Sequence, residues 1–266
     1  MAEGRFVVQR LIAAGSFGLH SALVSPTALA ALEVPLRGVD APVYVAPQPL
    51  LNEIAGFSFH RGCLALAVRP SARSVDAPSG SHLLLGLESI GNPDNVGGLF
   101  RTAATLGVDA VLLGAPSGDP FYRKAIRTSM GAVLQMPFVT VGDWPEAVAT
   151  LRGTGFSVIA LTPQDSAMPL DEYAVRRRAD ERLLVLVGAK GSGLSAALLA
   201  AADVRVRIPI ASAVDSVDVV VAAGIALSRL GGNRRSGDQE ISRSKDQKIS
   251  RSRLPRRFRE MTILRY

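Results

Sequence analysis

Six short apolar runs, separated by stretches with helical periodicity, constrain the fold of this chain most strongly from His82 onward. Each run is apolar along its whole length, which is typical of parallel strands that are covered on both faces. The pattern predicts an α/β fold with a parallel sheet, and such sheets bind ligands at the carboxyl ends of their strands. The predicted strands are 83–87, 110–114, 137–141, 157–162, 182–188 and 205–210, and the predicted helices are 95–106, 120–133, 144–152, 169–178 and 195–202.

The first 68 residues show a shorter alternation of helical and strand-like patterns, which predicts a separate small α/β domain. Its predicted helices are 4–15 and 25–33, the second capped by Ser25, and its predicted strands are 21–25, 42–46 and 63–68. Residues 69–81 are rich in Pro, Ser, Ala and Gly and lack periodicity, so we expect a linker there. The larger domain then spans 82–232.

The positive charge is confined to the last segment of the chain. Residues 233–266 hold eleven Lys or Arg and four Asp or Glu, so their net charge of +7 equals that of the whole chain. The high isoelectric point is therefore no evidence that the folded body binds nucleic acid. The segment repeats DQEISRS as DQKISRS, and a polar, basic repeat of this kind predicts disorder.

Cysteine, histidine and hydropathy patterns exclude several classes of protein. The single cysteine, Cys63, rules out an intramolecular disulfide and favours a reducing compartment. The longest strongly apolar stretch, 219–227, is too short for a membrane span, and the start shows no signal-peptide pattern. We therefore expect a soluble cytoplasmic protein. His20, His60 and His82 have no metal-ligand spacing, so we predict no metal.

The first motif is NPDNVGGLFRTAATLG, 92–107, which predicts a helix capped by Asn95. Gly97 and Gly98 weaken its first turn, and Arg101 lies off the apolar face one turn later. One interpretation is that the glycines leave the backbone open, so that an anion such as phosphate meets N–H donors and a guanidinium together. The alternative is an ordinary helix start with a solvated arginine. The predicted apolar face consists of Val96, Leu99, Phe100 and Ala103.

The second motif is LVGAKGSGLS, 186–195, in which a strand runs into Gly188, Gly191 and Gly193 before a helix capped by Ser195. Glycines at this point allow a tight turn and a close approach of the backbone to a ligand. The motif is neither GxGxxG nor a P-loop. The alternative is that the turn uses glycine only for its own geometry.

The third motif is RIPIASAVDSVDVVVAAGIALSRL, 207–230. After a strand and a loop of small residues, Ser216 is placed to cap a helix over 217–230. That helix is apolar nearly all round, which predicts burial on more than one side. It is therefore either a core helix or part of a subunit interface.

These three motifs, in this order and together with DPFYRKAIRTSMGAVLQMPF at 119–138, resemble the SpoU (TrmH) family of RNA ribose 2′-O-methyltransferases, within the SPOUT superfamily. The resemblance covers about 82–230, and a weaker one links EGRFVVQRLIAAG and FSFHRGCLALAVRP to the small substrate-binding domain of members that act on rRNA. It implies a parallel sheet with a C-terminal trefoil knot, S-adenosylmethionine as cofactor, RNA as partner and a homodimer.

The resemblance also implies roles for individual residues. Arg101 would activate or stabilise the ribose 2′-oxygen, and Asn95 would orient the ribose or phosphate beside it. Arg127 and Ser129 would contact RNA or the partner subunit. The remaining implied site residues are Ser216 and Asp218 at the catalytic centre, and Gly188, Lys190, Gly191, Gly193, Ile208, Ile210 and Val217 around the cofactor.

Two positions depart from the family pattern. Lys190 stands where the family has an acidic residue, and Asp218 stands where it has asparagine. The departures predict either a weakened enzyme or a compensating Lys190–Asp218 ion pair. Besides an active methyltransferase, the sequence thus allows a knotted RNA-binding protein without turnover. A nucleotide-binding oxidoreductase is disfavoured because no GxGxxG follows the first strand of either domain.

Overall fold

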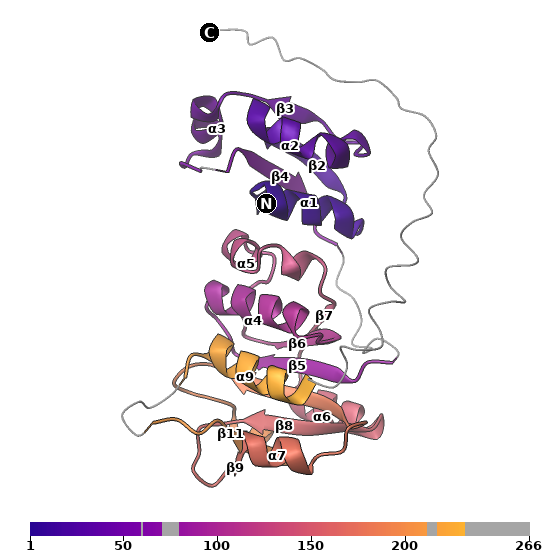
Figure 1. The fold of residues 1–266 in the computed structure, drawn as a ribbon, viewed down its shortest axis with the longest axis vertical. Coiled ribbons are helices and arrows are strands. Elements are labelled where there is room, and N and C mark those ends of the chain that lie inside the picture. The colour runs from indigo at the N-terminus through magenta and orange to yellow at the C-terminus, as the bar shows by residue number, and fades with distance from the viewer. Residues whose placement is uncertain (60, 71–79, 212–216, 232–266) are drawn as a thin grey trace. The chain divides into compact units, whose positions relative to one another are not determined.

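The computed structural model describes residues 1–59, 61–70, 80–211 and 217–231 (Figure 1). These residues form two compact units, one within residues 1–70 and the other within residues 80–231. The predictions of a disordered tail at 233–266 and of a capping Ser216 lie outside the described residues, as does most of the predicted linker. The domain boundaries at 68 and 82 therefore stay a proposal.

The larger unit is built on a seven-stranded sheet in which every pairing is parallel, with the strand order β7-β6-β5-β10-β8-β11-β9. All residues of β5 and β6 are buried, as expected for strands with both faces covered. The six predicted strands are confirmed, although the last ends earlier than expected. The strands are β5 (Leu83–Glu88), β6 (Ala110–Gly114), β7 (Phe138–Val141), β8 (Phe156–Leu161), β9 (Met168–Pro169), β10 (Arg182–Gly188) and β11 (Val204–Arg207).

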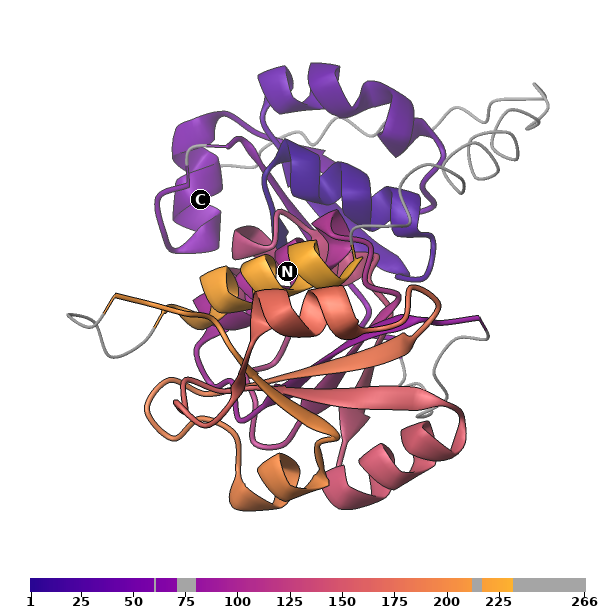
Figure 2. The same cartoon turned by 60° about the horizontal axis from the view of Figure 1, so that its bottom comes forward.

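Helices cover both faces of this sheet (Figure 2). On one face α6 and α8 pack on the strands around Trp144, Leu151 and Leu198. On the other face α9 packs against both α4 and α7, and α4 also packs against α5. The helices are α4 (Pro93–Thr105), α5 (Arg123–Thr128), the 3-10 turn η1 (Ala132–Leu134), α6 (Trp144–Gly153), α7 (Leu170–Arg176), α8 (Ala196–Ala201) and α9 (Val219–Gly231).

The smaller unit has a four-stranded mixed sheet in the order β1-β4-β2-β3. The structure adds two elements that the sequence pattern did not predict, namely β1 (Ala2–Glu3) and α3 (Gln48–Ala55). Ser25 accepts a hydrogen bond from the Ala28 amide at 3.1 Å, which confirms its predicted role as a helix cap. The other elements are α1 (Arg5–Ala14), β2 (Leu19–Val24), α2 (Pro26–Arg37), β3 (Val43–Val45) and β4 (Cys63–Ala67).

Across the part of the chain that the structure describes, no helix combines the length and apolar character needed to cross a membrane. Within the same residues, no three His, Cys, Asp or Glu side chains gather as a metal site would require. Burial raises the pKa of the Cys63 thiol to about 11, so this cysteine is protonated at neutral pH.

Candidate functional site

The three motifs start from one edge of the large sheet. Glu88 and Gly188 are the last residues of the adjacent strands β5 and β10, and they stand opposite each other in the parallel register. The third motif leaves the same edge at Arg207, the last residue of β11, which follows β10 and β8 in the strand order. Since ligands of parallel sheets bind at this edge, the fold places all three motifs where a shared site is expected.

A buried carboxylate links the end of β5 to the second motif. Glu88 is only 9% exposed, and its Oε2 accepts a hydrogen bond from the Ser195 amide at 2.7 Å. The Ser195 hydroxyl accepts in turn from the Leu198 amide at 3.3 Å, which confirms that Ser195 caps α8. Sequence reasoning missed Glu88, although it is the only acidic residue in an otherwise apolar run.

The segment that follows Glu88 is held by the loop after the neighbouring strand β6. Ser89 adopts φ +57°, a conformation that is strained for a residue with a side chain. The next residue, Ile90, donates from its amide to the Ser117 hydroxyl at 3.1 Å and accepts from the Gly118 amide at 2.8 Å. These contacts fix the direction in which the chain enters α4.

The glycines of the second motif form a closed turn. The Gly193 amide donates to the Ala189 carbonyl at 2.9 Å, and a Cβ on Gly188 would lie 2.2 Å from the Gly193 carbonyl carbon. Gly191 and Gly193 have φ of +94° and +65°, which disfavour other residues. The turn therefore needs its glycines for its own geometry. Lys190 and Gly191 are exposed at its tip, and the space beside Gly191 is open.

The helix of the first motif begins earlier than predicted. Its cap is Asn92, whose side chain accepts from the Asp94 amide at 2.9 Å, and Pro93 is the first helical residue. The prediction that Asn95 caps the helix is therefore wrong, because proline with its fixed φ favours the first helical position. Asn95 lies in the first turn and is half-buried. The predicted apolar face is confirmed, since Val96, Leu99, Phe100 and Ala103 are all buried.

The two glycines of this helix serve helix packing. A Cβ on Gly97 would lie 2.5 Å from the Ala125 carbonyl oxygen on α5. A Cβ on Gly98 would lie 2.8 Å from the Val220 side chain on α9. Both distances are shorter than real side chains allow, so α4 approaches α5 and α9 only because the side chains are absent. The interpretation that the glycines open the backbone to a ligand is corrected accordingly.

Arg101 lies on the exposed side of α4, as predicted. Within the described ranges its guanidinium has no hydrogen-bond or ion-pair partner. By contrast, Asp94 binds α4 to α5 through the Lys124 ammonium at 2.7 Å and the Thr128 hydroxyl at 3.0 Å. The hydrogen bond from Lys124 lowers the pKa of the Asp94 carboxyl. The helix is thus fixed at its start while Arg101 stays available for a ligand.

The two residues expected to contact RNA from α5 differ in position. Arg127 is exposed, and its contact with RNA stays a prediction. Ser129 has no exposed surface, and its hydroxyl donates to the Ile126 carbonyl at 2.9 Å. The prediction for Ser129 is therefore wrong, because the side chain is used inside the protein to end the helix.

The described residues of the third motif flank the segment 212–216. Ile208 and Val217 are half-buried, and Ile210 is 39% exposed. Asp218 immediately precedes α9, and its Oδ1 accepts from the Val220 amide at 2.9 Å. Its carbonyl accepts from the Ala222 amide at 2.8 Å, so Asp218 occupies the cap position. The helix starts at Val219, two residues later than predicted.

The two departures from the family pattern do not pair with each other. Among the residues described, no ion pair joins Lys190 to Asp218, and both side chains are exposed. The compensation hypothesis therefore gains no support from the structure. The hypothesis of a weakened enzyme stays a prediction.

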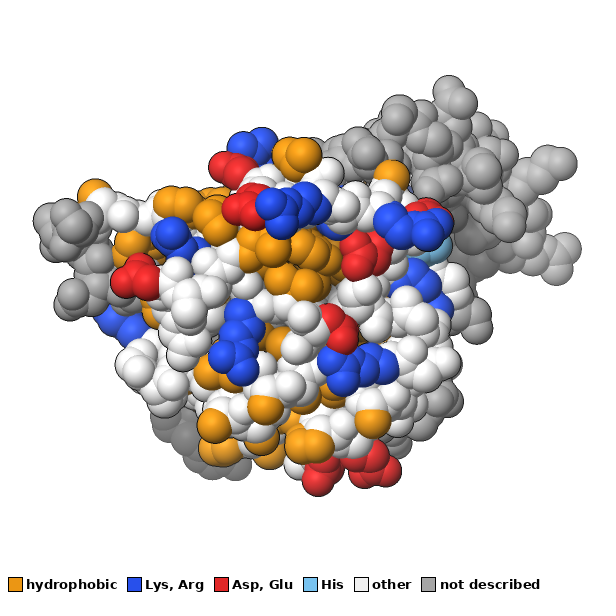
Figure 3. Space-filling view, turned by 90° about the horizontal axis from the view of Figure 1, so that it is seen from below, with side chains coloured by type: hydrophobic (Ala, Val, Ile, Leu, Met, Phe, Trp, Pro, Cys, Tyr) orange, Lys and Arg blue, Asp and Glu red, His pale blue; other side chains and the backbone are white. Residues whose placement is uncertain are grey.

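The helix α9 is buried on one side only. Ala223, Ala226, Leu227 and Leu230 face the core, whereas Val221 is 52% and Ile225 39% exposed. The expectation of burial on more than one side is wrong for a single chain. The adjoining helix α7 adds Val175, which is 86% exposed. Figure 3 views the molecule from the side on which α7 lies in Figure 1, and there hydrophobic side chains gather among charged ones.

Comparison with known proteins agrees with this arrangement. Residues 82–228 match the model of the SpoU rRNA Methylase family. An uncharacterized tRNA/rRNA methyltransferase of Mycobacterium tuberculosis is 41% identical over 227 residues, which is 85% of this chain and 78% of that protein. A 23S rRNA (guanosine-2′-O-)-methyltransferase of a Burkholderia species is 31% identical over 193 residues, 71% of this chain and 76% of that protein.

The fold also matches a solved structure. The SpoU methyltransferase AviRb from Streptomyces viridochromogenes, crystallised with AdoMet, superimposes with a TM-score of 0.74 at 20% identity and covers 89% of this chain and 90% of that one. At this identity the match shows the fold alone. The family model covers more than half of the chain, and the mycobacterial relative aligns over most of both proteins. The chain belongs to the SpoU rRNA Methylase family.

Proposed function

We propose that this protein transfers a methyl group from S-adenosylmethionine to a ribose 2′-hydroxyl of structured RNA, with rRNA as substrate. One observation carries the proposal: the three family motifs leave one edge of the sheet, and Arg101 is exposed on the helix that begins there. The name of the Burkholderia relative supports both the ribose position and rRNA.

The groups at this edge fit the proposed cofactor. The turn 188–193 and the ends of β5 and β11 offer backbone donors and acceptors, while Ile208 and Ile210 offer apolar surface. Such a set suits an adenosine moiety, which needs polar contacts at its edges and apolar contacts on its faces. We assign cofactor binding to Gly188, Lys190, Gly191, Gly193, Ile208, Ile210 and Val217. When bound, S-adenosylmethionine supplies an electrophilic methyl group on a sulfonium.

The chain's own residues orient the acceptor and manage its proton. A ribose hydroxyl is a weak nucleophile while protonated, so the site has to hold it in line with the methyl group and favour loss of the proton. A guanidinium beside the 2′-oxygen stabilises the negative charge that develops there. We assign this role to Arg101. Asn95, in the first turn of the same helix, would orient the ribose or phosphate, and Ser216 and Asp218 would complete the site.

Six further features belong to this proposal. The family resemblance supports a C-terminal trefoil knot and a small RNA-binding domain at residues 1–68. The exposed apolar residues Val221, Ile225 and Val175 support a homodimer that buries α9 and α7. Arg127 would contact RNA. We also propose a cytoplasmic location and a reaction that needs no metal.

The test compares methyl transfer by wild-type protein and the Arg101→Ala variant. Unmodified rRNA from cells lacking the protein is the substrate, and mass spectrometry locates the methylated ribose. We expect turnover to fall about a hundredfold or more, because a group that stabilises developing charge is lost. Calorimetric affinity for S-adenosylmethionine should stay unchanged.

Arg178→Ala is the matched control, since Arg178 is exposed, paired with Asp180 and located just before the opposite end of β10. Its turnover should equal that of the wild type. Undiminished turnover by Arg101→Ala would overturn the assignment of Arg101. Absence of transfer by the wild-type protein itself would favour the alternative of an RNA-binding protein without turnover.

A further inference from the structure

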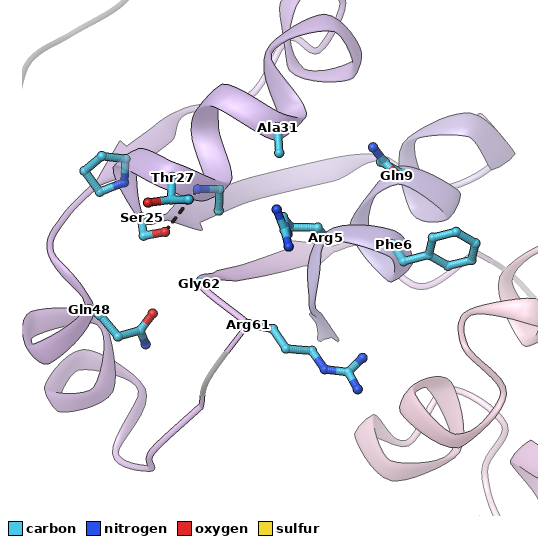
Figure 4. Close-up of a pocket in the computed structure, with 11 residues that line it drawn as sticks. Arg5, Phe6, Gln9, Ser25, Thr27, Ala31, Gln48, Arg61 and Gly62 are labelled. Atoms are coloured by element: carbon cyan, nitrogen blue, oxygen red, sulfur yellow. Dashed lines mark hydrogen bonds between the residues drawn. The ribbon is translucent and has the colours of Figure 1, made fainter.

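The smaller unit contains a cavity of about 790 Å³ that lies outside the candidate methyl-transfer site (Figure 4). It is lined by the first residues of α1, α2 and α3 and by the chain that enters β4. The polar groups around it are the side chains of Arg5, Gln9, Ser25, Thr27, Gln48 and Arg61.

The lining is cationic and contains no carboxylate. Arg5 and Arg61 are exposed, and within the described part of the chain neither has a hydrogen-bond or ion-pair partner. Glu3, two residues before Arg5, is buried and does not line the cavity. Two unpaired guanidinium groups beside hydroxyl and amide donors are suited to an anion such as phosphate.

The local backbone holds this arrangement in place. Gly4 has φ +94°, and a Cβ there would lie 2.9 Å from the Arg61 Cδ. Gly62 has φ +66°, and a Cβ there would lie 2.6 Å from the Ser25 hydroxyl. The Ser25 amide also donates to the Gly62 carbonyl at 2.7 Å. Because Gly4 has no side chain, Arg61 can pack beside the start of α1. Because Gly62 has none, the chain that enters β4 can reach the start of α2.

The helices that begin at the cavity add to its positive potential. None of α1, α2 and α3 has an acidic residue in its first turn, and α1 and α3 have no side-chain cap. Unneutralised helix starts favour a bound anion, although here they only support what the arginines already indicate.

An aromatic ring at the margin of the cavity points to the rest of the ligand. Phe6 lines the cavity and is 49% exposed, and the Arg10 guanidinium lies 4.8 Å from its ring centroid. In Figure 4 the ring extends outward from α1. An exposed ring backed by an arginine is a surface on which an unpaired base can stack, whereas a base inside a duplex cannot reach it.

We propose that this cavity binds an unpaired nucleotide of the RNA substrate. Its phosphate lies between Arg5 and Arg61, and the neighbouring base stacks on Phe6. The inference rests on the proposed function, because RNA is the ligand that brings phosphate and unpaired bases together. The smaller unit then selects RNA that contains a single-stranded segment.

The test measures the affinity of the full-length protein for two fluorescein-labelled probes at constant salt, a short oligouridylate and a blunt RNA duplex of equal length. Arg5→Ala and Arg61→Ala should each weaken oligouridylate binding roughly tenfold or more, since each removes a charged contact to phosphate. Phe6→Ala should weaken it at least about fivefold. Binding of the duplex should change by less than about twofold.

Arg37→Ala is the matched control, because Arg37 is the last residue of α2 and pairs with Glu33 away from the helix start. It removes the same charge and should leave both affinities unchanged. Equal losses for Arg37→Ala and Arg5→Ala would overturn the proposal, as would equal losses on both probes. Because S-adenosylmethionine binding and methyl transfer are measured separately, failure here is distinct from failure of the proposed function.

Discussion

Replacing Gly97 by alanine separates a packing role of this glycine from a ligand-binding role. The added Cβ would lie 2.5 Å from the Ala125 carbonyl oxygen, 2.9 Å from the Thr128 Cβ and 3.0 Å from the Ser129 amide nitrogen. Two of these three atoms belong to the backbone of α5 and its C-cap residue Ser129, so relief requires the helices to move apart. Inserting a methyl group into such a contact costs about 1–3 kcal/mol.

The helix itself gains from the same substitution. Alanine is favoured over glycine inside a helix by about 0.5–1 kcal/mol. Because the clash involves backbone atoms that cannot rotate away, we expect the cost of the contact to lie in the upper part of the range of about 1–3 kcal/mol. After the gain in helix propensity is subtracted, the free energy of unfolding should fall by about 1–2 kcal/mol. With an ordinary denaturant dependence, this lowers the urea midpoint by about 0.5–1 M.

The single tryptophan provides the assay. Trp144 is buried in the larger unit, so its fluorescence in a urea titration reports the unfolding of the unit that holds Gly97. Gly153→Ala in α6 is the matched control, because a Cβ there has nothing within 4 Å. Its stability should stay level or rise by up to about 1 kcal/mol. An unchanged midpoint for Gly97→Ala combined with lost RNA methylation would refute the packing explanation.

Two further predictions concern the edge of the sheet. Glu88→Ala removes the acceptor of the Ser195 amide, so calorimetric affinity for S-adenosylmethionine should weaken by about fivefold or more. Glu88→Gln keeps an acceptor oxygen and should bind S-adenosylmethionine nearly as well as the wild type. Equal affinities for both variants would show that the bond does not shape the turn. Asp218→Ala should lower the free energy of unfolding by about 1 kcal/mol, because the Val220 amide loses its hydrogen-bond acceptor. Asp218→Asn keeps an acceptor, so its loss in the same urea titration should be less than about 0.5 kcal/mol. Identical midpoints for all three proteins would refute the capping role.

The strands of the large sheet could be predicted because burial on both faces leaves a direct trace in the sequence. Leu83–Glu88 and Ala110–Gly114 are buried at every position, and both appear as apolar runs. The helix α3 was missed since it is short and starts among prolines, where a helix and a turn share the same local pattern. The sequence pattern allows either Asn92 or Asn95 as the cap of α4, and Pro93, which favours the first helical position, is the signal that points to Asn92.

Contacts between distant residues explain the remaining errors. Ser129 looks like an ordinary polar residue, yet the packing of α5 removes it from solvent completely. Gly97 looks like an opening in the helix until α5 is placed beside it. The bond between Glu88, at the end of β5, and Ser195, the cap of α8, joins two residues that are separated by 107 positions in the chain. A single sequence carries the residue types for such contacts but not the pairing.

The two departures from the family pattern now have different physical meanings. Asp218 caps α9, and aspartate and asparagine are about equally good caps because both accept a hydrogen bond from the first turn. Its charge is also favoured at a helix start. Lys190 makes no such contact among the described residues and lies exposed at the tip of the turn, where it reverses the charge of the family pattern. A change in activity relative to the family pattern is therefore expected to follow position 190 rather than position 218.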